Sequence, residues 1–514
     1  MKPDHDLHSD AAEKPDAPAP DKKERDAGMP AVHAKAESAK PGEEHARMTH
    51  SPAPGDAMAR GDHAAMMRHG PAAEASGGNH ERAMYRDSLW ASFVNLLFGI
   101  WLIASPPTLG YGDSLASSDY ASGALVVVLS ALAFARRWNT YARWAICFVG
   151  LWVMFAPLVF WTPSAAAYLN DSLVGALVIA FAALVTMMPG MDMSVMMAGP
   201  DVPPGWSYNP STWLQRAPII LLAAVGFFAS RYMAAFQLGH ISQAWDPVFG
   251  EGTRRVLQSD VSKMFPVSDA GLGAVSYLLE ILMGFMGDRA RWRTMPWMVT
   301  FFGILVVPLG ATSIMLVILQ PLSVGAWCFL CLLAALAMLA MVPATLDEVA
   351  AMIQFLIQAR REGKPLWRTF WHGGVIEGGE RDDRLTPFDW SRPQEMFAGW
   401  LRGVWHLLIV AGVGGWLMFA PDFFSTTGRA SDSDRLVGAL ALTFALVATA
   451  EVGRALRLFN LILGAWLVIA PWVLDGFMAG ARWNDVVAGI AVISLSLPRG
   501  KIRGRYGSWQ PFIV

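Results

Sequence analysis

Apolar runs long enough to cross a membrane recur along most of this chain. A hydrocarbon core of about 30 Å is crossed by roughly 20 apolar residues in a helix, and the runs beyond residue 88 have about this length. We therefore predict an all-α polytopic membrane protein with about 12 transmembrane helices. The expected spans are 88–105, 120–136, 141–159, 171–187, 215–237, 269–286, 296–319, 324–343, 402–420, 434–450, 455–473 and 484–498.

The first 85 residues lack this pattern. They are rich in Ala, Pro, Gly, His and charged residues, with no apolar periodicity. Such a segment buries too little apolar surface to offset the entropy lost on ordering. We expect residues 1–85 to form a disordered cytoplasmic tail.

Basic residues fall in alternate loops between the predicted spans. Because short loops rich in Lys and Arg stay on the cytoplasmic side of a membrane, both termini are expected in the cytoplasm. The start of the eighth span then lies on the outer side. The clusters are Arg136, Arg137 and Arg143; Arg289, Arg291 and Arg293; Arg360, Arg361 and Lys364; Arg454 and Arg457; and Arg499, Lys501, Arg503 and Arg505.

A two-helix motif with a period of about 50 residues occurs four times. Its first helix ends in G-x-W-x-x-x-[SA]-P, and its second opens with an Asp four residues before a Gly. We interpret the Trp as an interface anchor, the Pro as a helix stop, the Asp as a helix cap and the Gly as a point of close backbone approach. The instances begin at Gly99, Gly150, Gly414 and Gly464, and the Asp–Gly pairs are 119/123, 171/175, 434/438 and 485/489.

This motif resembles the SPW repeat of bacterial membrane proteins, over residues 86–190 and 401–498. The resemblance implies a membrane hairpin module in a bacterial inner membrane. A different segment lies between the two repeat pairs: a Met- and Pro-rich linker (191–212), a core (213–362) of four spans with an amphipathic stretch (346–361) on the cytoplasmic face, and a cytoplasmic linker (363–400). Residues 499–514 are expected to form a basic cytoplasmic tail.

The charge and composition of the chain indicate which classes of partner it can bind. Charged residues make up 16% of the chain and the net charge is −2, so no basic surface exists for nucleic acid and none is expected as a partner. Histidine and methionine are copper ligands, but their spacing here is irregular and we predict no metal site. Eight of the eleven histidines lie in the tail, at 5, 8, 33, 45, 50, 63, 69 and 80, and six methionines crowd the loop after the fourth span, at 187, 188, 191, 193, 196 and 197.

Two of the three cysteines, Cys328 and Cys331, form a C-x-x-C pair at the start of the eighth span. At a helix start, two such side chains are within reach of a disulfide, and the exposed amides and dipole favour the thiolate. Such a pair beside the lipid phase suits the transfer of two electrons to a quinone. The alternative is a pair of small buried apolar residues, which is how we interpret Cys147.

The segment around the pair resembles the vitamin K epoxide reductases and their bacterial quinone-linked thiol oxidase relatives. Residues 325–331, the loop 246–259 and the stretch 268–277 carry the resemblance, in the order that this family shows. It implies that Cys331 faces a lipid quinone and forms the adduct, whereas Cys328 exchanges disulfides with an electron donor. The donor would be a periplasmic thioredoxin-like thiol protein or a small thiol.

The sequence departs from this family at two places. Trp245 and Thr253 stand in the loop where relatives carry a second cysteine pair, so an outside thiol must react with Cys328 directly or the usual cycle is lost. Ala335 stands where animal relatives present a Tyr to the quinone. We therefore expect ubiquinone or menaquinone rather than vitamin K, and no tightly bound cofactor.

Three further residues are weaker candidates for the quinone site. Asp269 matches the position of an Asn that binds a quinone carbonyl in animal relatives, and its alternative role is the N-cap of the sixth span. Ser259 lies in the loop, and its alternative role is a local cap. Glu280 is an intramembrane carboxyl, which is a functional candidate by default, and its alternative role is a protonated packing contact.

These features favour a membrane thiol–quinone oxidoreductase that passes electrons from a periplasmic thiol through the cysteine pair to a lipid quinone. A second hypothesis is a membrane scaffold or metal-handling protein that keeps the core fold without turnover. The missing loop cysteines favour this second hypothesis, whereas the intact C-x-x-C at the outer face favours the enzyme.

The basic clusters make the topology testable. A reporter active only outside the cytoplasm should work when it is fused near Pro106 or Phe249 and fail near Arg137 or Arg291, because the arginine-rich loops stay inside. Activity of the fusion near Arg291 would reverse the orientation and place the cysteine pair on the reducing side.

Overall fold

The computed structural model describes residues 71–184, 193–381 and 391–513. In these segments almost all regular structure is helical, and β structure is limited to two isolated bridges, Val202 with Glu380 and Trp206 with Tyr506. A nearly all-helical chain satisfies its backbone hydrogen bonds within each segment, as spanning a bilayer requires.

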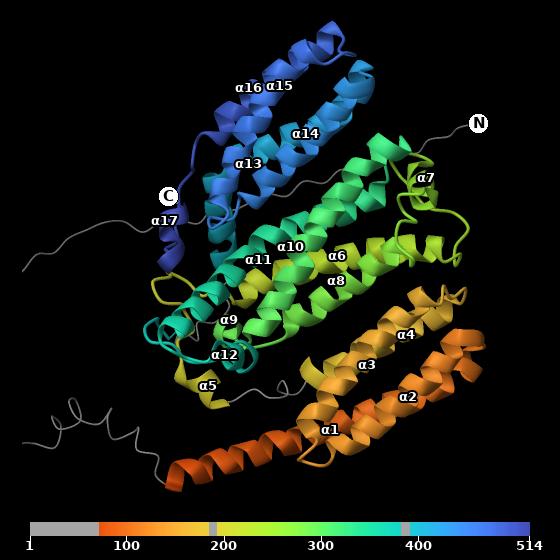
Figure 1. Ribbon diagram of the computed structural model, residues 1–514, viewed down its shortest axis with the longest axis vertical. Coiled ribbons are helices and arrows are strands. Elements are labelled where there is room, and N and C mark those ends of the chain that lie inside the picture. The colour runs from red at the N-terminus through yellow and green to blue at the C-terminus, as the bar shows by residue number, and fades with distance from the viewer. Residues whose placement is uncertain (1–70, 185–192, 382–390, 514) are drawn as a thin grey trace, which may run out of the picture. The chain divides into compact units, whose positions relative to one another are not determined.

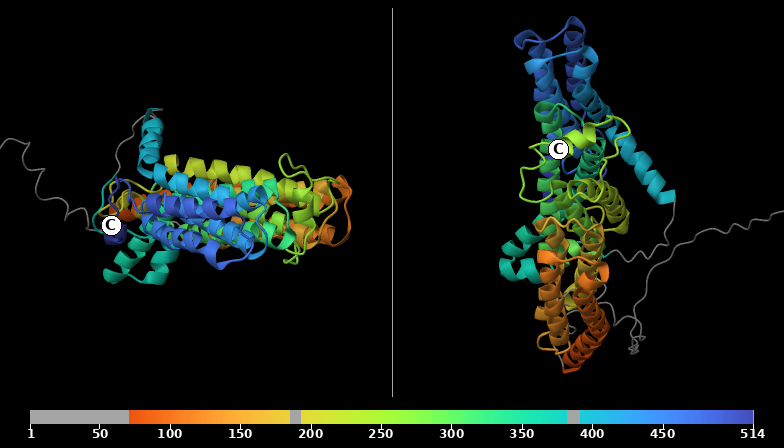
Figure 2. Two further views of the ribbon diagram at one scale, coloured as in Figure 1. Left: turned by 90° about the horizontal axis from the view of Figure 1, so that it is seen from above. Right: turned by 90° about the vertical axis from the view of Figure 1, so that its right-hand side faces the viewer.

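The helices form three successive groups (Figure 1). The N-terminal hairpin pair consists of α1 (Pro71–Leu109), α2 (Asp113–Ala133), α3 (Asn139–Val159) and α4 (Ala165–Ile179), which a π-helical turn (Ala180–Leu184) continues. The core follows short α5 (Met193–Ala198) and consists of α6 (Trp213–Gln237), α7 (Gly252–Gln258), α8 (Asp269–Phe285), α9 (Arg291–Thr294), α10 (Pro296–Leu319), a π-helical turn (Gln320–Val324), α11 (Phe329–Arg361) and α12 (Leu366–His372). The C-terminal hairpin pair consists of α13 (Ser391–Phe424), α14 (Gly428–Val447), a 3₁₀ turn (Arg454–Leu458), α15 (Phe459–Val473) and α16 (Ala479–Ser496), and it is followed by a 3₁₀ turn (Gly507–Trp509) and α17 (Gln510–Ile513). The axes of most long helices in these groups lie roughly parallel to one another, and the two helices of each hairpin run in opposite directions (Figure 2).

Each of the twelve predicted spans coincides with a helix, which confirms a polytopic all-α membrane protein. In the described ranges, nine helices are long and apolar enough to cross a membrane. The remaining three predicted spans fall on α8, α14 and α16. Helix α8 has 17 residues, and α14 and α16 carry charged residues in their first half. The number twelve therefore stays a prediction.

Several predicted boundaries are wrong. Helix α1 begins at Pro71, within the tail expected to be disordered, and α13 begins at Ser391, within the expected linker; residues 1–70 lie outside the described part. The stretch 346–361 is no separate surface helix, because α11 continues through it as a single helix. Ala351 and Phe355 are fully buried there, so core packing extends the helix.

The glycines of the repeats bring two helices of each hairpin into backbone contact, as predicted. A Cβ atom on Gly438 would lie 2.6 Å from the carbonyl oxygen of Gly414, and one on Gly414 would lie 2.6 Å from that of Gly438. The same reciprocal contact, at 2.6 to 2.9 Å, joins Gly99 with Gly123, Gly150 with Gly175 and Gly464 with Gly489. Any side chain at these positions would separate the helices.

The repeat aspartates do not cap their helices, contrary to the prediction. Helices α2, α4, α14 and α16 begin six residues before Asp119, Asp171, Asp434 and Asp485. All four side chains are buried, and Asp171 and Asp485 accept hydrogen bonds from the side-chain amides of Asn170 and Asn484 at 3.0 and 3.2 Å. The aspartates therefore lie within the packing between helices and not at the helix starts.

The repeat tryptophans connect the two hairpins of each pair. In every case the indole N–H donates to the residue that precedes the Asp of the other repeat. The four bonds are Trp101 to Asn170 (2.7 Å), Trp152 to Ser118 (3.0 Å), Trp416 to Asn484 (2.9 Å) and Trp466 to Ser433 (2.9 Å). The motif thus encodes packing between repeats as well as anchoring of each hairpin.

Two arginines of a predicted cytoplasmic loop are buried in the core. Arg291 donates from Nε and Nη2 to the two carboxylate oxygens of Glu348 at 2.5 and 2.6 Å. Arg293 donates to the carbonyls of Val195, Met196 and Pro200. Removing one partner of a buried bidentate pair leaves an uncompensated charge, so Arg291 and Glu348 hold this loop in place.

The C-terminal segment 499–514, expected as a basic tail, packs against other parts of the chain. Tyr506 is buried and donates to Glu451 at 2.9 Å, and Trp509 donates to the carbonyl of Ala350 at 2.9 Å. Gln354 of α11 accepts from the Trp206 indole at 3.0 Å. These bonds bring the end of the chain and the linker 191–212 together on α11.

The glycine contacts predict different effects for two changes in one hairpin. Gly438→Ala should lower the free energy of unfolding by about 1–3 kcal/mol, because the added methyl group would meet backbone atoms of α13. Gly412→Ala in α13 has open space around its Cβ and should be neutral or slightly stabilising. Thermal unfolding in detergent measures both, and equal losses would contradict the close-packing account.

Candidate functional site

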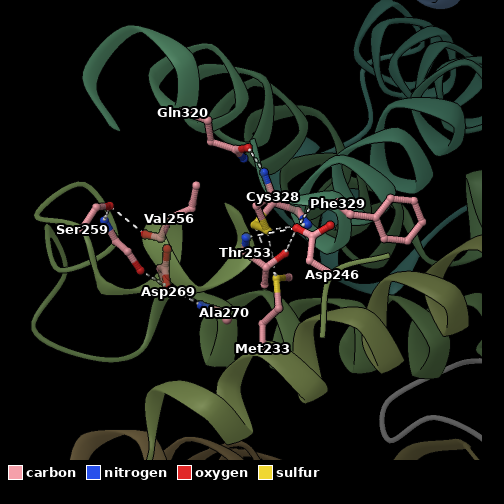
Figure 3. The surroundings of a disulfide bond; sticks show 12 residues. Met233, Asp246, Thr253, Val256, Ser259, Asp269, Ala270, Gln320, Cys328 and Phe329 are labelled. Atoms are coloured by element: carbon pink, nitrogen blue, oxygen red, sulfur yellow. Dashed lines mark hydrogen bonds between the residues drawn. A yellow bond between two sulfur atoms is a disulfide. The ribbon is translucent and has the colours of Figure 1, made fainter. Parts of the chain in front are cut away.

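The two cysteines lie at the amino end of α11 and form a disulfide, with their Cα atoms 5.3 Å apart (Figure 3). Cys328 is the N-cap of the helix, and its sulfur accepts from the amide of Cys331 at 3.1 Å. Gly325 has a φ of 66°, a conformation that favours glycine, and turns the chain out of the preceding π-helical segment. Gln320 of that segment accepts from the amide of Cys328 at 2.9 Å.

The loop between α6 and α8 is fastened to this helix end by Asp246. One carboxylate oxygen accepts from the amide of Thr253 at 3.0 Å, its hydroxyl at 2.6 Å and the amide of Phe329 at 3.4 Å. The other accepts from the amides of Val248 and Phe249 at 3.0 and 2.7 Å. Asp246 therefore joins α7 to the first residue of α11.

The electrostatics of Asp246 follow from these bonds. Partial burial alone would raise the pKa of its carboxyl. The hydrogen bonds that it accepts stabilise the charged form and hold the pKa below the ordinary value; they come from Thr253, Phe249, Val248 and Phe329. A negative charge is also favoured near a helix amino end. The carboxylate therefore stays ionised at neutral pH.

Helix α7 covers Cys328. Cys328 and Thr253 have no exposed surface, and Figure 3 shows Thr253 beside the cysteine. A Cβ atom on Gly252 would lie 2.0 Å from the carbonyl oxygen of Trp327, so the loop lies directly against the cysteine turn. Trp245, in contrast, is 58% exposed and contacts the ring of Phe329 edge to face, at 6.1 Å between centroids.

Cys331 faces the opposite side and lines a cavity of about 350 Å³. The walls are mainly apolar side chains of α8, α10 and α11, and the loop contributes Val256, Leu257, Val261 and Phe265. Met233 of α6 lies between the cavity and the disulfide, with its sulfur 3.4 Å from that of Cys331 and 3.8 Å from that of Cys328. The two cysteines thus have separate surroundings.

Asp269 lines the same cavity, but it is not the helix cap, and its role at a quinone site stays a prediction. Ser268 caps α8, because its hydroxyl accepts from the amide of Gly271 at 2.9 Å. The Asp269 carboxylate accepts from Gln237 at 2.5 Å, Ser262 at 3.1 Å and its neighbour's amide, Ala270, at 2.7 Å. Gln237 and Ser262 are the polar partners that sequence reasoning missed.

The comparisons with known proteins agree with this architecture. Residues 217–346 match the Vitamin K epoxide reductase family. Residues 89–185 and 404–498, on either side, match the SPW repeat domain. No curated protein and no solved structure matches the chain. At a coarse level, the family match supports a membrane oxidoreductase of the thiol–quinone type.

In this vitamin K epoxide reductase-like core, the position of Ala335 is of particular interest. Ala335 lines the cavity without a polar group, but Tyr277 of α8 also lines it and donates to the carbonyl of Ala334 at 2.6 Å. An aromatic hydroxyl is therefore near the position where animal relatives place a Tyr, although it comes from another helix. A Tyr within an apolar helix is the sequence signal that could have identified it.

The other two candidates lie outside the cavity lining. Ser259 donates to the carbonyl of Val256 at 2.7 Å, which matches its alternative role as a local cap. Glu280 is fully buried, and neither carboxylate oxygen has a hydrogen-bond partner among the described residues. Its functional assignment stays a prediction.

The structure describes only some of the residues considered as metal ligands. Within residues 71–184, 193–381 and 391–513, no group of three His, Cys, Asp or Glu side chains could hold a metal ion. The histidines at 5, 8, 33, 45, 50, 63 and 69, and Met187, Met188 and Met191, lie outside the described residues.

The C-terminal SPW pair directly contacts the turn that precedes α11 and carries Cys328. The ring centroids of Trp327 and Phe419 are 4.8 Å apart, and Phe249 of the loop stacks on Phe419 at 6.0 Å. The indole of Trp327 donates to Asp422 at 3.4 Å. Phe419 of α13 therefore contacts both the cysteine turn and the loop that covers it.

The Asp246 bonds predict how well Cys328 is protected. Asp246→Asn should speed the reduction of the disulfide by a water-soluble phosphine by about tenfold, because losing bonds to a charged acceptor weakens the cover by more than 1 kcal/mol. Asp260→Asn, in the same loop, is the matched control and should leave the rate unchanged.

The pH dependence has a defined sign. A carboxyl whose pKa is lowered by folding contributes stability above its unfolded pKa and loses it only as the pH falls through the folded value. The rate at which phosphine reduces the disulfide should therefore not increase between pH 8 and pH 5, because Asp246 stays ionised and keeps its bonds to α7. An increase in that range that is absent from Asp246→Asn would contradict the assignment.

Proposed function

We propose that the chain is a membrane thiol–quinone oxidoreductase of the bacterial inner membrane. The observation that carries this proposal is the disulfide at the wall of an apolar cavity, with Cys331 facing the cavity and Cys328 facing the covering loop. A redox pair with one sulfur toward lipid and one toward an aqueous loop separates an acceptor site from a donor site.

The cavity suits a quinone head group. Mainly apolar walls with a few polar groups are typical of small-molecule sites, and Ser230 and Ser313 line the cavity with hydroxyls that would donate to quinone carbonyls. An ionised Asp269 can only accept hydrogen bonds. It would donate to a carbonyl only in the protonated form, so Asp269 would hold a quinone as the neutral acid.

The electron path follows from the two environments. In the reduced pair, the Cys331 thiolate adds to the quinone and forms a C–S bond. The Cys328 thiol, after deprotonation, attacks the Cys331 sulfur, so that the S–S bond forms as the bond between this sulfur and the quinone breaks. The two electrons stay on the quinone, which takes up the two protons released by the thiols and leaves as a quinol. An outside dithiol then reduces the disulfide through a mixed disulfide on Cys328 and is itself oxidised.

Access to Cys328 requires a movement of the loop. The sulfur is buried beneath α7, so a donor thiol reaches it only when α7 and Thr253 shift away from Trp327. Relatives place a cysteine in this loop, whereas Thr253 cannot exchange electrons. The donor is therefore an external thiol, such as a periplasmic thioredoxin-like protein, and the acceptor is ubiquinone or menaquinone.

The orientation of the enzyme is part of the proposal. With both termini in the cytoplasm, the cysteine pair lies near the periplasmic face, where disulfides persist. The arginine clusters support this orientation.

One observation favours the rival function, a scaffold without turnover. Cys328 is buried and the loop provides no relay cysteine, so the disulfide would then serve only to fix the start of α11. The two functions differ in whether a quinone changes the redox state of the pair.

The cysteine variants separate the two functions. Purified protein supplied with a dithiol should reduce a short-chain quinone, and both Cys328→Ser and Cys331→Ser should lose at least about 100-fold of that activity, because neither remaining sulfur can complete the disulfide. Cys147→Ser is the matched control and should retain the wild-type rate, measured by quinone absorbance.

The two variants should also fail in different ways. Cys331→Ser should trap a reducible mixed disulfide with a thiol protein through Cys328, whereas Cys328→Ser should give long-wavelength absorbance with quinone through the Cys331 thiolate. A wild-type protein that shows no quinone reduction while it is correctly folded would promote the scaffold function.

A further inference from the structure

A second and larger groove, of about 790 Å³, lies between the N-terminal hairpin pair and the core. Helix α3 forms one wall, α8 and α10 form the other, and the end of α12 contributes Trp371 and His372. Most of the lining is apolar, including Leu151, Leu282 and Ile304. The groove shares no residue with the cavity beside Cys331.

The apolar helices that line the groove determine what can fill it. Its walls are helices that are long and apolar enough to cross a membrane, together with α8 between them. Water has few partners on such walls, so hydrocarbon chains are the natural contents. A lipid acyl chain therefore fits the greater part of the groove.

One end of the groove has a different character. Trp297 lies edge to face with Trp144 at 5.1 Å between ring centroids and stacks on Trp371 at 6.1 Å. Tryptophan concentrates at the level of the lipid headgroups. These three rings therefore mark the end at which the acyl chain of a lipid would give way to its headgroup.

The charge at this end is positive. Arg137 and His372 are the ionisable basic side chains of the lining, and no Asp or Glu belongs to it. Arg137 is exposed at the start of the α3 segment, with its guanidinium 5.6 Å from the centroid of the Trp138 ring. A guanidinium binds a phosphate with several donors, whereas a neutral quinone would gain nothing from this charge.

We propose that this groove binds one anionic phospholipid, with an acyl chain between α3 and α10 and the phosphate at Arg137. The lipid would fill the space between the N-terminal SPW pair and the core, and so join the two. The site is separate from the redox reaction and does not depend on it.

Cys147 provides a direct readout, because it lines the groove and is the one cysteine outside the disulfide. The protein would be placed in nanodiscs of phosphatidylcholine, with or without phosphatidylglycerol, and labelled with an apolar maleimide. Phosphatidylglycerol should slow labelling of Cys147 by about fivefold, the factor expected from one arginine at a lipid surface.

Arg137→Gln should abolish this difference between the two lipids, whereas Arg136→Gln, which removes the adjacent charge outside the groove lining, should preserve it. Unchanged thermal unfolding would show that both variants are folded. Native mass spectrometry of the same samples should find one phosphatidylglycerol retained by the wild type and lost from Arg137→Gln.

Three results would overturn the proposal. Equal labelling in both lipids, with no lipid retained, would show an ordinary annular environment. Retention of phosphatidylcholine as strongly as phosphatidylglycerol would remove the role of Arg137. Retention of a quinone that protects Cys147 would assign the groove to a different ligand.

Discussion

The bonds of Asp246 hold together the parts that surround the cysteine pair. Its carboxylate accepts from α7 and from the first residue of α11, so the loop that covers Cys328 and the helix that carries both cysteines are fixed by one side chain. The disulfide, the cover over Cys328 and the wall of the cavity all meet at this point. Hydrogen bonds to an ionised carboxylate are stronger than those between neutral groups, and a negative charge is also favoured at the amino end of a helix.

This arrangement gives the two sulfurs unequal access. Cys331 lines an apolar cavity, whereas Cys328 lies beneath Thr253 and Gly252. The SPW pair contributes to the asymmetry, because Phe419 contacts both Trp327 and Phe249. A movement of the loop would therefore have to break contacts with the C-terminal hairpins as well as with Asp246. These contacts connect the C-terminal SPW pair physically to the turn that carries Cys328.

The sequence predicted the features that depend on local pattern. Apolar length located the helices, the C-x-x-C spacing located a disulfide, and the repeated Gly positions predicted backbone contacts that the structure contains, such as Gly414 with Gly438. Asp269 was placed at the quinone site through a family resemblance, and the structure puts it in the lining of the cavity beside Cys331. These features follow from residues close together or in a fixed order.

The features that the sequence did not predict depend on distant partners. Asp485 was expected to cap a helix, but it is buried beside Asn484, and Asn484 accepts from Trp416 of the other repeat. Met233 and Tyr277 reach the cavity from helices far along the chain, and Gln237 binds Asp269 across 32 residues. The stretch 346–361 was expected on the surface because its polar face is visible in sequence, whereas its buried contacts are not.

The redox state of the cysteine pair in native membranes tests the central claim most directly. Thiols would be trapped with a mass-shifting maleimide in membranes from cells with normal quinone and from cells depleted of it, with Cys147 as the internal control. The account predicts an oxidised Cys328–Cys331 pair with quinone and a reduced pair after depletion while the thiol donor is present. The same redox state under both conditions would contradict a thiol–quinone oxidoreductase.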